Sequence, residues 1–379
     1  MSPEESVLIK LIKQSQFGPS EIIDFSCVDM DILYMEAEQQ SVLGIVAPEI
    51  PFDFINDNWQ QVKDKQIFNY IRYCHAQDEF AMLLERSSIP FVILKGNASA
   101  IYYADPTLRY MGDIDVLVPN TLYKDTKTVL VSSGYTEVRD NGRHSVFKKD
   151  EYIFEVHHHF CHEIDFEDIV LDGLNNRVFE TVDGHNFPML PKLANGLVLL
   201  DHFRRHLQAA IGLRQVIDWM MFVYHNLDDE FWNNVFKPVL QAKGMEKLAI
   251  TLTRMCQLYL GLPKNISWCQ CGDEELCRLI LDSTLSTGNF GSKSGKGKTI
   301  ESVGVTFLRE GFFSRLQHAG EKNWEAYQSH HYLKPLCWLY QLIRYIKRGL
   351  KSGRSFKQFK SDSYRSKKRY ELIQKLMSE

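Results

Sequence analysis

Apolar residues recur at every third or fourth position through most of the first 88 residues. The segments "EESVLIKLIKQ" and "IFNYIRYCHAQDEFAMLLERS" show this spacing most clearly. Such spacing places the apolar side chains on one face of a helix. Between these segments, the two prolines of "GIVAPEIPFD" predict an irregular connection. We therefore expect residues 1–88 to form an N-terminal helical region.

A different pattern begins at residue 89. The short apolar runs "FVIL", "DIDVLV" and "YIFEVHH" are typical of strands, and "HSVFKKD" would pair with the last of them as a hairpin. Between the strands, "NTLYKDTKTVLVSSGY" has the spacing of an amphipathic helix that ends at Gly134. Residues 89–190 are therefore predicted to form an α+β core, a small mixed sheet with helices.

Helical spacing returns at residue 191 with "NGLVLLDHFRRHLQAAIGLRQVIDWMMFVYHN". Further helices are expected up to about residue 283, before the polar, glycine-rich stretch "STGNFGSKSGKGKTIES". This pattern predicts a C-terminal helical domain at residues 191–340, followed by a basic tail at residues 341–379.

Two carboxylates interrupt the predicted strand "GDIDVLV". Asp113 and Asp115 are two residues apart, so in a strand they project from the same face, while Ile114 and Val116 project from the other. Two neighbouring carboxylates repel each other, and each loses hydration if it is buried. A divalent cation such as Mg²⁺ removes both costs, although an Asp pair at a strand end is also common in ordinary turns.

The later strand "YIFEVHHHF" supplies a third carboxylate, Glu155, with His157 and His159 on the same face. Three carboxylates from adjacent strands would hold two metal ions, which activate an attacking hydroxyl and neutralise a leaving pyrophosphate. His157 is then a candidate contact to a metal ligand or to the acceptor molecule.

Residues upstream of the Asp pair suit a triphosphate. Gly96 ends an apolar strand and opens a short helix, so backbone N–H groups there would bind phosphate oxygens. Lys95 and Arg109 would add charge-assisted contacts, with Asn97 beside them.

The succession "LKG…R…GDIDVLV…EVHHH" resembles the DNA polymerase beta-like nucleotidyltransferase superfamily, in particular a bacterial branch of uncharacterised nucleotidyltransferases. Members of that branch often lie in surface-polysaccharide gene clusters. The segments "DHFRRHLQAAIGLRQVIDW" and "TGNFG" are also similar to it, so the resemblance spans roughly residues 65–295.

The resemblance implies catalytic metal ligands at Asp113, Asp115 and Glu155 for Mg²⁺ or Mn²⁺, and a triphosphate at Lys95 and Gly96. This chain departs from the superfamily pattern at Asn97, where a serine is usual.

The predicted helix after residue 191 carries further candidates. His202 and His206 have the spacing of a zinc helix, but Phe203 stands where such a helix has its glutamate. Packing against the core is the simpler interpretation. Arg214 would contact the nucleotide or the acceptor, or would pair with Asp218 one helical turn away.

Composition narrows the class of protein. Of the 379 residues, 44% are hydrophobic and 24% charged, as in ordinary globular proteins. No stretch has the length and apolar character of a transmembrane helix, and the start "MSPEESVLIKLIKQSQ" lacks the features of a secretory signal. We therefore expect a cytoplasmic protein.

Two local motifs resemble a zinc site and a phosphate-binding loop, but each lacks a residue that such a site requires. The eight cysteines are irregularly spaced, which predicts free thiols, and "CQCGDEELC" offers three thiols where a structural zinc site has four ligands. The stretch "GSKSGKGKT" has Ser292 where a phosphate-binding P-loop requires glycine.

Charge is unevenly distributed. The net charge is −4, but residues 341–379 contain 12 Lys and Arg against 3 Asp and Glu. An apolar stripe runs beside these charges from Trp338 to Ile346. Residues 336–369 would therefore contact an anionic membrane surface, with nucleic acid or simple packing as alternatives.

Taken together, these patterns predict an Mg²⁺-dependent nucleotidyltransferase that moves a nucleoside monophosphate from a nucleoside triphosphate to an acceptor hydroxyl. A sugar or surface-polysaccharide precursor is the expected acceptor, on the family resemblance alone. The alternatives are transfer to a protein or a tRNA, and a module that binds nucleotide or polyanion without catalysis.

Overall fold

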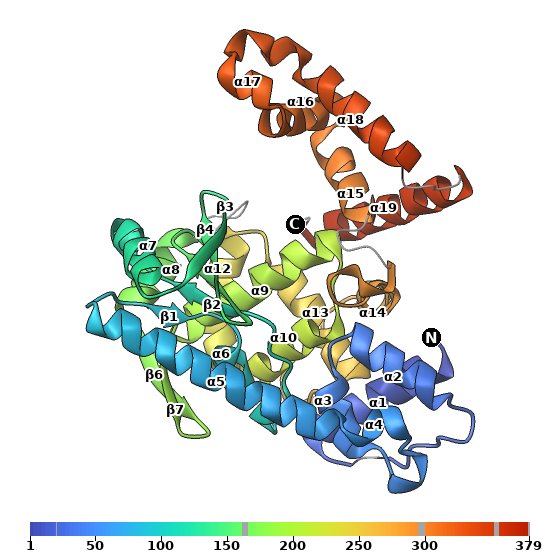
Figure 1. Cartoon of the computed structure of the whole chain (residues 1–379). Helices are drawn as coiled ribbons and strands as arrows, with labels where there is room; N and C mark the ends of the chain where they lie inside the picture. Colours follow the sequence, from blue (N-terminus) through green and yellow to red (C-terminus); the bar gives the residue numbers. More distant parts are fainter. Residues whose placement is uncertain (20, 161–165, 295–299, 352–355, 378–379) are drawn as a thin grey trace.

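A seven-stranded mixed sheet forms the centre of the chain, with helices on both sides (Figure 1). The computed structural model describes residues 1–19, 21–160, 166–294, 300–351 and 356–377. The strand order is β3-β4-β5-β2-β1-β7-β6. The predicted mixed-sheet core between two helical segments is therefore confirmed.

The strands are short, as the apolar runs predicted. Their bounds are β1 Val92–Ile93, β2 Ile114–Leu117, β3 Thr136–Asp140, β4 His144–Lys149, β5 Tyr152–His157, β6 Val178–Val182 and β7 His185–Met189. β2 runs parallel to β5, and β1 runs antiparallel to β2 and parallel to β7. β4 pairs with β5 as the predicted hairpin.

The hairpin of β6 and β7 was not anticipated from the sequence. Its turn is Asp183-Gly184, and both residues have positive φ, 48° and 84°. An Asp-Gly pair between strands favours such a turn, because its backbone twist matches that of the flanking strands. The dipeptide was therefore a usable signal.

The N-terminal region is helical, as predicted for residues 1–88. Its α-helices are α1 Pro3–Phe17, α2 Met30–Gln39, α3 Leu43–Val46, α4 Asp57–Gln60 and α5 Val62–Arg86. α1 begins with a capping box, in which Ser2 and Glu5 each accept a hydrogen bond from the backbone N–H of the other. α5 packs against the sheet, where Phe80 stacks on Phe154 with ring centroids 4.8 Å apart.

Three helices lie within the core region, α6 Asn97–Ala100, α7 Tyr123–Ser132 and α8 Glu167–Asn175. The two faces of β2 belong to different apolar clusters. Ile114 and Val116 join the cluster that contains α5 and α7. The opposite face of the sheet lies toward the cluster that contains α9 and α10, so Asp115 lies between the sheet and these helices.

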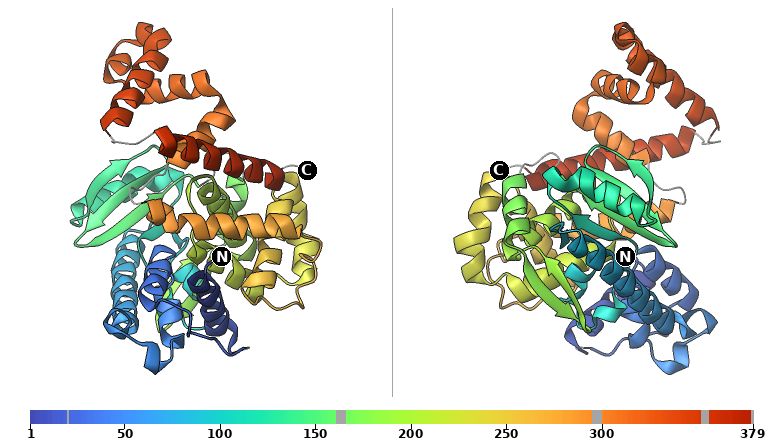
Figure 2. Two further views of the ribbon diagram at one scale, coloured as in Figure 1. Left: turned by 90° about the vertical axis from the view of Figure 1, so that its right-hand side faces the viewer. Right: turned by 60° about the vertical axis from the view of Figure 1, so that its left-hand side comes forward.

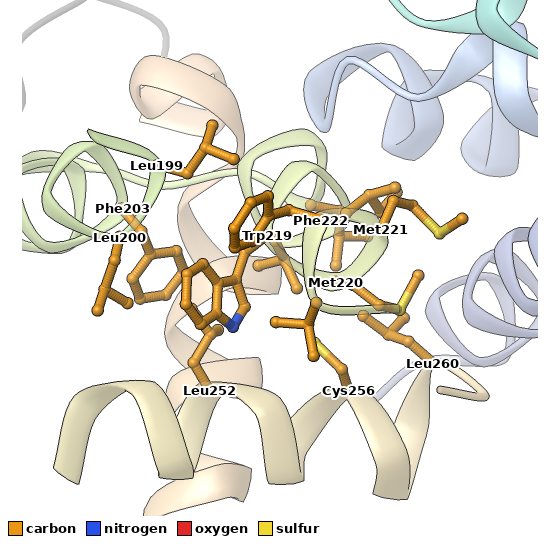
Figure 3. Packing of buried hydrophobic residues seen from close by; sticks show 14 of the residues in the cluster. Leu199, Leu200, Phe203, Trp219, Met220, Met221, Phe222, Leu252, Cys256 and Leu260 are labelled. Carbon is orange, nitrogen blue, oxygen red and sulfur yellow. The ribbon is translucent and has the colours of Figure 1, made fainter. Parts of the chain in front are cut away.

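The following helices build the larger apolar cluster. They are α9 Lys192–Ala209, α10 Leu213–Asn226, α11 Asp229–Phe231, α12 Lys237–Ala242, α13 Glu246–Tyr259 and α14 Glu274–Thr287. Figure 3 shows Trp219 of α10 packed between Phe203 of α9 and Leu252 of α13. The indole N–H of Trp219 donates to the Thr253 hydroxyl at 3.0 Å, so its one polar atom is satisfied.

The last helices are α15 Ile300–Glu310, α16 Phe312–Asn323, α17 Glu325–Ser329, α18 Cys337–Lys351 and α19 Phe356–Met377. α16, α17 and α18 project away from the rest of the molecule in every view (Figures 1 and 2). α19 returns and packs on α9, α13 and α14, where Leu372, Ile373 and Leu376 are buried. The sequence predicted a basic tail here, but much of it is helical and its end belongs to the core. No helix within the described ranges has the length and apolar character needed to cross a membrane.

Candidate active site

The carboxylates predicted to share a site come from neighbouring strands. Asp115 of β2 lies directly opposite Glu155 of β5 in the parallel register. Asp113 precedes β2 by one residue and projects from the same face as Asp115. Parallel strands lie about 4.8 Å apart, so the side chains of such a pair are neighbours. The structure therefore brings together the two strand positions that the sequence selected.

Asp115 is buried, with 2% of its side chain exposed, and two cationic or polar groups contact it. The Lys95 ammonium is 2.8 Å from Oδ2, and His157 Nε2 is 3.1 Å from Oδ1. Burial alone would raise the pKa of Asp115. The charge of Lys95 and the hydrogen bond from His157 outweigh burial, so the pKa lies well below its usual range and the carboxylate is ionised.

The other two carboxylates lack such compensation. Burial, followed by the negative charge of Asp115, raises the pKa of both Asp113 and Glu155. This part of the site therefore has more negative charge than its protein neighbours neutralise. Oxygen ligands with excess negative charge on a rigid strand fit a hard divalent cation such as Mg²⁺.

Two histidines adjoin the carboxylates. His144 of β4 lies opposite His157 of β5 in the antiparallel register, and the ring centroids are 4.7 Å apart. His144, Glu155 and His157 offer three ligand atoms that all lie within 4.8 Å of one another. Burial, then the neighbouring His157, lowers the pKa of His144 to about 4, so its imidazole is neutral.

Positively charged side chains lie nearby on α9 and α10. The charges of Lys95, Arg205 and Arg214 all act to lower the pKa of His202, although burial is the main cause. Burial also lowers the pKa of His206 to about 3, again with Lys95 as the next cause. Both imidazoles are therefore neutral beside three cations.

Arg214 is the least satisfied of these cations. Only 8% of the residue is exposed, and its Nε has no hydrogen-bond partner among the described residues. Its guanidinium lies 5.9 Å from the centroid of the Tyr110 ring, and its charge acts on Asp113. No ion pair between Arg214 and Asp218 is found in the described part of the chain.

Arg109, which the sequence assigned to the triphosphate, forms an ion pair with Asp218 in the structure. Its Nε and Nη2 donate to the two carboxylate oxygens of Asp218, each at 2.8 Å. Tyr103 donates to the same carboxylate at 2.7 Å, and Arg109 is only 1% exposed. This buried pair ties the loop before β2 to α10, so we assign Arg109 a positioning role.

Asn97 also differs from the expectation. Its amide contacts the Cys74 thiol, with Nδ2 3.3 Å from Sγ, and the residue is fully buried against α5. The side chain therefore faces the core. Gly96 has φ 59° and ψ −116°, a conformation that residues with a Cβ rarely adopt, which explains glycine at this turn.

The remaining histidines of "HHHFCH" point in different directions. His158 stacks on Tyr123 and bonds to Asn120, while His159 contacts Glu167. His162 lies outside the described residues. Of this segment, only His157 reaches the carboxylates in the described part of the chain.

The cysteine cluster has the features of ordinary thiols. Cys269 and Cys277 are buried and Cys271 is exposed, and all three are free. Burial raises the pKa of Cys269 and of Cys277 to about 12, which disfavours the thiolate that zinc requires. The P-loop-like stretch forms a short helical turn at Asn289–Ser294, and residues 295–299 lie outside the described ranges.

Sequence reasoning missed the approach of His144 to His157 and the effect of Arg205 on His202. The pairing of β4 with β5 was predicted without its register, and register decides which residues face each other. For α9, the run "DHFRRH" was a signal, because histidines and arginines recur at helical spacing.

A mixed sheet that places paired carboxylates beside a lysine and buried cations is the architecture of a nucleotidyltransferase, an enzyme whose substrate is a nucleotide. The chain belongs to the uncharacterised nucleotidyltransferase family, whose model matches residues 27–261. The family predicted from the sequence is confirmed, although the matched segment begins and ends earlier than the expected one.

Two solved structures also match part of this chain. A crystal structure of ANT(2″)-Ia in complex with adenylyl-2″-tobramycin has a TM-score of 0.34 and 10% identity, covering 45% of this chain and 98% of that chain. A solution structure of the antibiotic-resistance factor ANT(2″)-Ia has a TM-score of 0.35 and 10% identity, covering 45% and 93%. No curated protein matches this chain.

Proposed function

We propose that this chain transfers a nucleoside monophosphate from a nucleoside triphosphate to a hydroxyl group of a small molecule, with Mg²⁺ or Mn²⁺ held by Asp113, Asp115 and Glu155. The observation that carries the proposal is the parallel pairing of Asp115 with Glu155, with Asp113 as the third carboxylate. The negative charge of Asp113 and Glu155 is only partly compensated by the neighbouring cations. A bound divalent cation would polarise the phosphate and stabilise the charge of the departing pyrophosphate.

The protein groups then position the triphosphate. Lys95 already lies 2.8 Å from Asp115, so a small movement of its flexible side chain would let it contact a phosphate bound at the same carboxylate. Gly96 leaves the turn beside it open, since a Cβ there would have no neighbour closer than 3.9 Å. Arg214 supplies a buried guanidinium whose Nε has no partner in the described part of the chain, which suits it to a phosphate oxygen.

A cavity at the loop that precedes Asp113 is our candidate for the acceptor site. It has a volume of about 410 Å³ and lies between α2, α3 and α5 on one side and the loop before β2 on the other. Tyr34, Tyr73 and Tyr110 line it together with Lys65 and Asn69. Aromatic rings with polar groups around them suit the apolar faces and hydroxyls of a sugar.

The position of this cavity fits the proposed transfer. Tyr110 and Met111 line it and lead directly into Gly112 and Asp113. The Tyr73 hydroxyl donates to the backbone oxygen of Gly112 at 2.8 Å. An acceptor bound here would approach the metal-bound phosphate from the Asp113 side, which favours a small acceptor such as a polysaccharide precursor over a protein or a tRNA.

A membrane contact through residues 336–369 is the second part of the proposal, and it rests on the projecting helices. Large apolar side chains are exposed there: Phe312, Phe313, Leu339, Ile343 and Ile346. Arg344 and Lys347 lie on the same helix as the last three. Apolar side chains flanked by cations bind anionic membrane surfaces, so we place the protein in the cytoplasm at the inner face of the membrane.

The transfer reaction is tested with the purified full chain, Mg²⁺, each labelled triphosphate beginning with ATP, and candidate sugars, tRNA or protein. Pyrophosphate release and labelled product should appear with a small acceptor. Asp113→Asn, Asp115→Asn and Glu155→Gln should each lower turnover by about 10³-fold, since loss of a metal ligand removes several kcal/mol of stabilisation. Asp125→Asn, an exposed carboxylate on α7, is the matched control.

Two results would overturn parts of this proposal. Magnesium-dependent triphosphate binding that survives the Asp113→Asn/Asp115→Asn double change would refute the metal ligands. Turnover that requires added tRNA or protein would refute the small acceptor, and binding without any turnover would favour the non-catalytic alternative.

Membrane contact has its own test, cosedimentation with vesicles. Wild-type protein should bind vesicles that contain anionic lipid and not neutral ones, and Phe313→Asp/Ile343→Asp should abolish binding. Phe52→Asp, at an even more exposed phenylalanine of the N-terminal region, should have no effect. Equal binding by the double variant and the wild type would refute the contact.

A further inference from the structure

We propose that His144, Glu155 and His157 form a second metal site, which shares Glu155 with the all-oxygen site at the Asp pair and binds a transition-metal ion such as Co²⁺ or Zn²⁺ in preference to Mg²⁺. The inference deepens the proposed function, on which it rests for the role of the neighbouring Asp115. The binding of the ion itself can be measured without any transfer reaction.

Backbone pairing places the three ligands together. His144 and His157 face each other across the antiparallel β4 and β5 pair, and Glu155 is two residues before His157 on the same face. Glu155 Oε2 lies 3.7 Å from His157 Nε2 and 3.9 Å from His144 Nε2. The ligands therefore come from two adjacent strands of one rigid hairpin.

The distances are close to those of a bound ion. Ligand atoms about 2.1 Å from a metal lie about 3.0–3.4 Å from one another in tetrahedral or octahedral geometry. Two of the three separations exceed this by less than about 1 Å, and all three lie within 4.8 Å, a gap that rotation of the side chains can close. Burial also favours the metal-bound arrangement, because only 15% of the His144 side chain and 10% of the His157 side chain are exposed.

The donor atoms determine which ion would bind. Imidazole nitrogen binds ions such as Co²⁺ and Zn²⁺, whereas Mg²⁺ and Mn²⁺ favour oxygen ligands. Two imidazoles and one carboxylate supply three protein ligands and leave coordination positions open, as in catalytic metal sites. The predicted Mg²⁺ site has carboxylates alone, so the two sites would differ in their preferred metal.

The neighbouring Asp115 links the two sites. Its Oδ1 lies 3.1 Å from His157 Nε2, the atom that would bind the ion. An ion at the histidines would take over this contact and bring its positive charge next to Asp115. The simpler interpretation is that His157 only orients Asp115, with His144 packed against it, and this interpretation requires no ion.

Metal binding by the chelator-treated full chain, without nucleotide, separates the two interpretations. Titration with Co²⁺, followed by its visible absorption, reports nitrogen ligands, and calorimetry with Mn²⁺, Zn²⁺ and Mg²⁺ gives the preference. We expect one histidine-dependent Co²⁺ or Zn²⁺ ion per chain and weaker binding of Mg²⁺. His144→Ala should lower the affinity for Co²⁺ at least 10-fold. Loss of a group that only supports a metal ligand already lowers metal affinity by about 10-fold or more.

Control variants assign the ion to this site. His185 is a histidine of β7 that is paired with Asp78 of α5, and His185→Ala should leave Co²⁺ binding unchanged. Asp113→Asn should also leave it unchanged, while abolishing the proposed transfer. His157→Gln, with thermal unfolding as a check on folding, provides a second variant of the site.

The outcomes distinguish this inference from the proposed function. Co²⁺ binding that is equal in wild type, His144→Ala and His157→Gln would overturn the second metal site, whatever the transfer assay shows. Histidine-dependent Co²⁺ binding by a chain that transfers no nucleotide would support the site and refute the proposed function.

Discussion

The buried pair of Arg109 and Asp218 gives the sharpest test of how the site is assembled. Replacing Arg109 by Met removes two hydrogen bonds of 2.8 Å. Among the described residues, the buried Asp218 carboxylate then keeps only the hydrogen bond from the Tyr103 hydroxyl. Removal of one partner from a buried ion pair costs about 3–5 kcal/mol. We therefore expect Arg109→Met to lower the free energy of unfolding by that amount.

A double-mutant cycle tests whether this cost belongs to the pair. Asp218→Leu alone strands the Arg109 guanidinium, which is 1% exposed, and should be similarly destabilising. The combination Arg109→Met/Asp218→Leu leaves no unpaired charge, so it should cost at least about 2 kcal/mol less than the sum of the single changes. Urea denaturation followed by fluorescence gives all four free energies of unfolding.

Two results would refute the reasoning. Additive costs would show that the two side chains do not act as a pair. If Arg109→Met kept full stability and lost triphosphate affinity, Arg109 would contact the nucleotide as the sequence predicted, and the positioning role would be wrong. Triphosphate affinity is therefore measured on the same samples, at urea concentrations where each variant is folded.

Three further predictions concern other parts of the molecule. Burial keeps His202 and His206 neutral in the folded chain, so their pKa values lie below the unfolded value of about 6.5. The free energy of unfolding therefore falls as the pH drops below about 6.5, by about 4 kcal/mol for both residues together at pH 5. Changing both to Gln should flatten this dependence in urea titrations, and an unchanged slope would contradict the assignment. Gly96→Ala forces a residue with a Cβ to adopt φ 59° and should cost about 1–3 kcal/mol in thermal unfolding, whereas full stability would show that the turn relaxes. Trp219→Phe removes the hydrogen bond to Thr253 and leaves space, which should cost about 2–3 kcal/mol in denaturant unfolding, and adding Thr253→Val should recover part of that loss.

Local pattern was sufficient to place the carboxylates. The two-residue repeat of a strand puts Asp113 and Asp115 on one face, and Glu155 was recognisable as the charged residue in an apolar strand. The parallel register that sets Asp115 opposite Glu155 agrees with that expectation, while the roles of these residues remain predictions.

Long-range pairing could not be predicted in the same way. Asp218 lies 109 residues after Arg109, and a lysine or arginine near a phosphate motif looks the same whether it binds a ligand or a buried carboxylate. Asn97 likewise faces Cys74 because α5 packs behind the turn, a contact between segments separated by 23 residues. Sequence spacing identifies which residues share an element, but tertiary packing decides which partner each one meets.

The contact between Lys95 and Asp115 determines how Mg²⁺ and the nucleotide would bind. The Lys95 ammonium neutralises the Asp115 carboxylate. A free Mg²⁺ ion must displace this ammonium in order to bind Asp115, so it gains little binding free energy. A magnesium–triphosphate complex brings both the ion for Asp115 and a phosphate for the released lysine. We therefore expect Mg²⁺ to bind Asp115 together with the nucleotide, because Lys95 competes with free Mg²⁺ for this carboxylate.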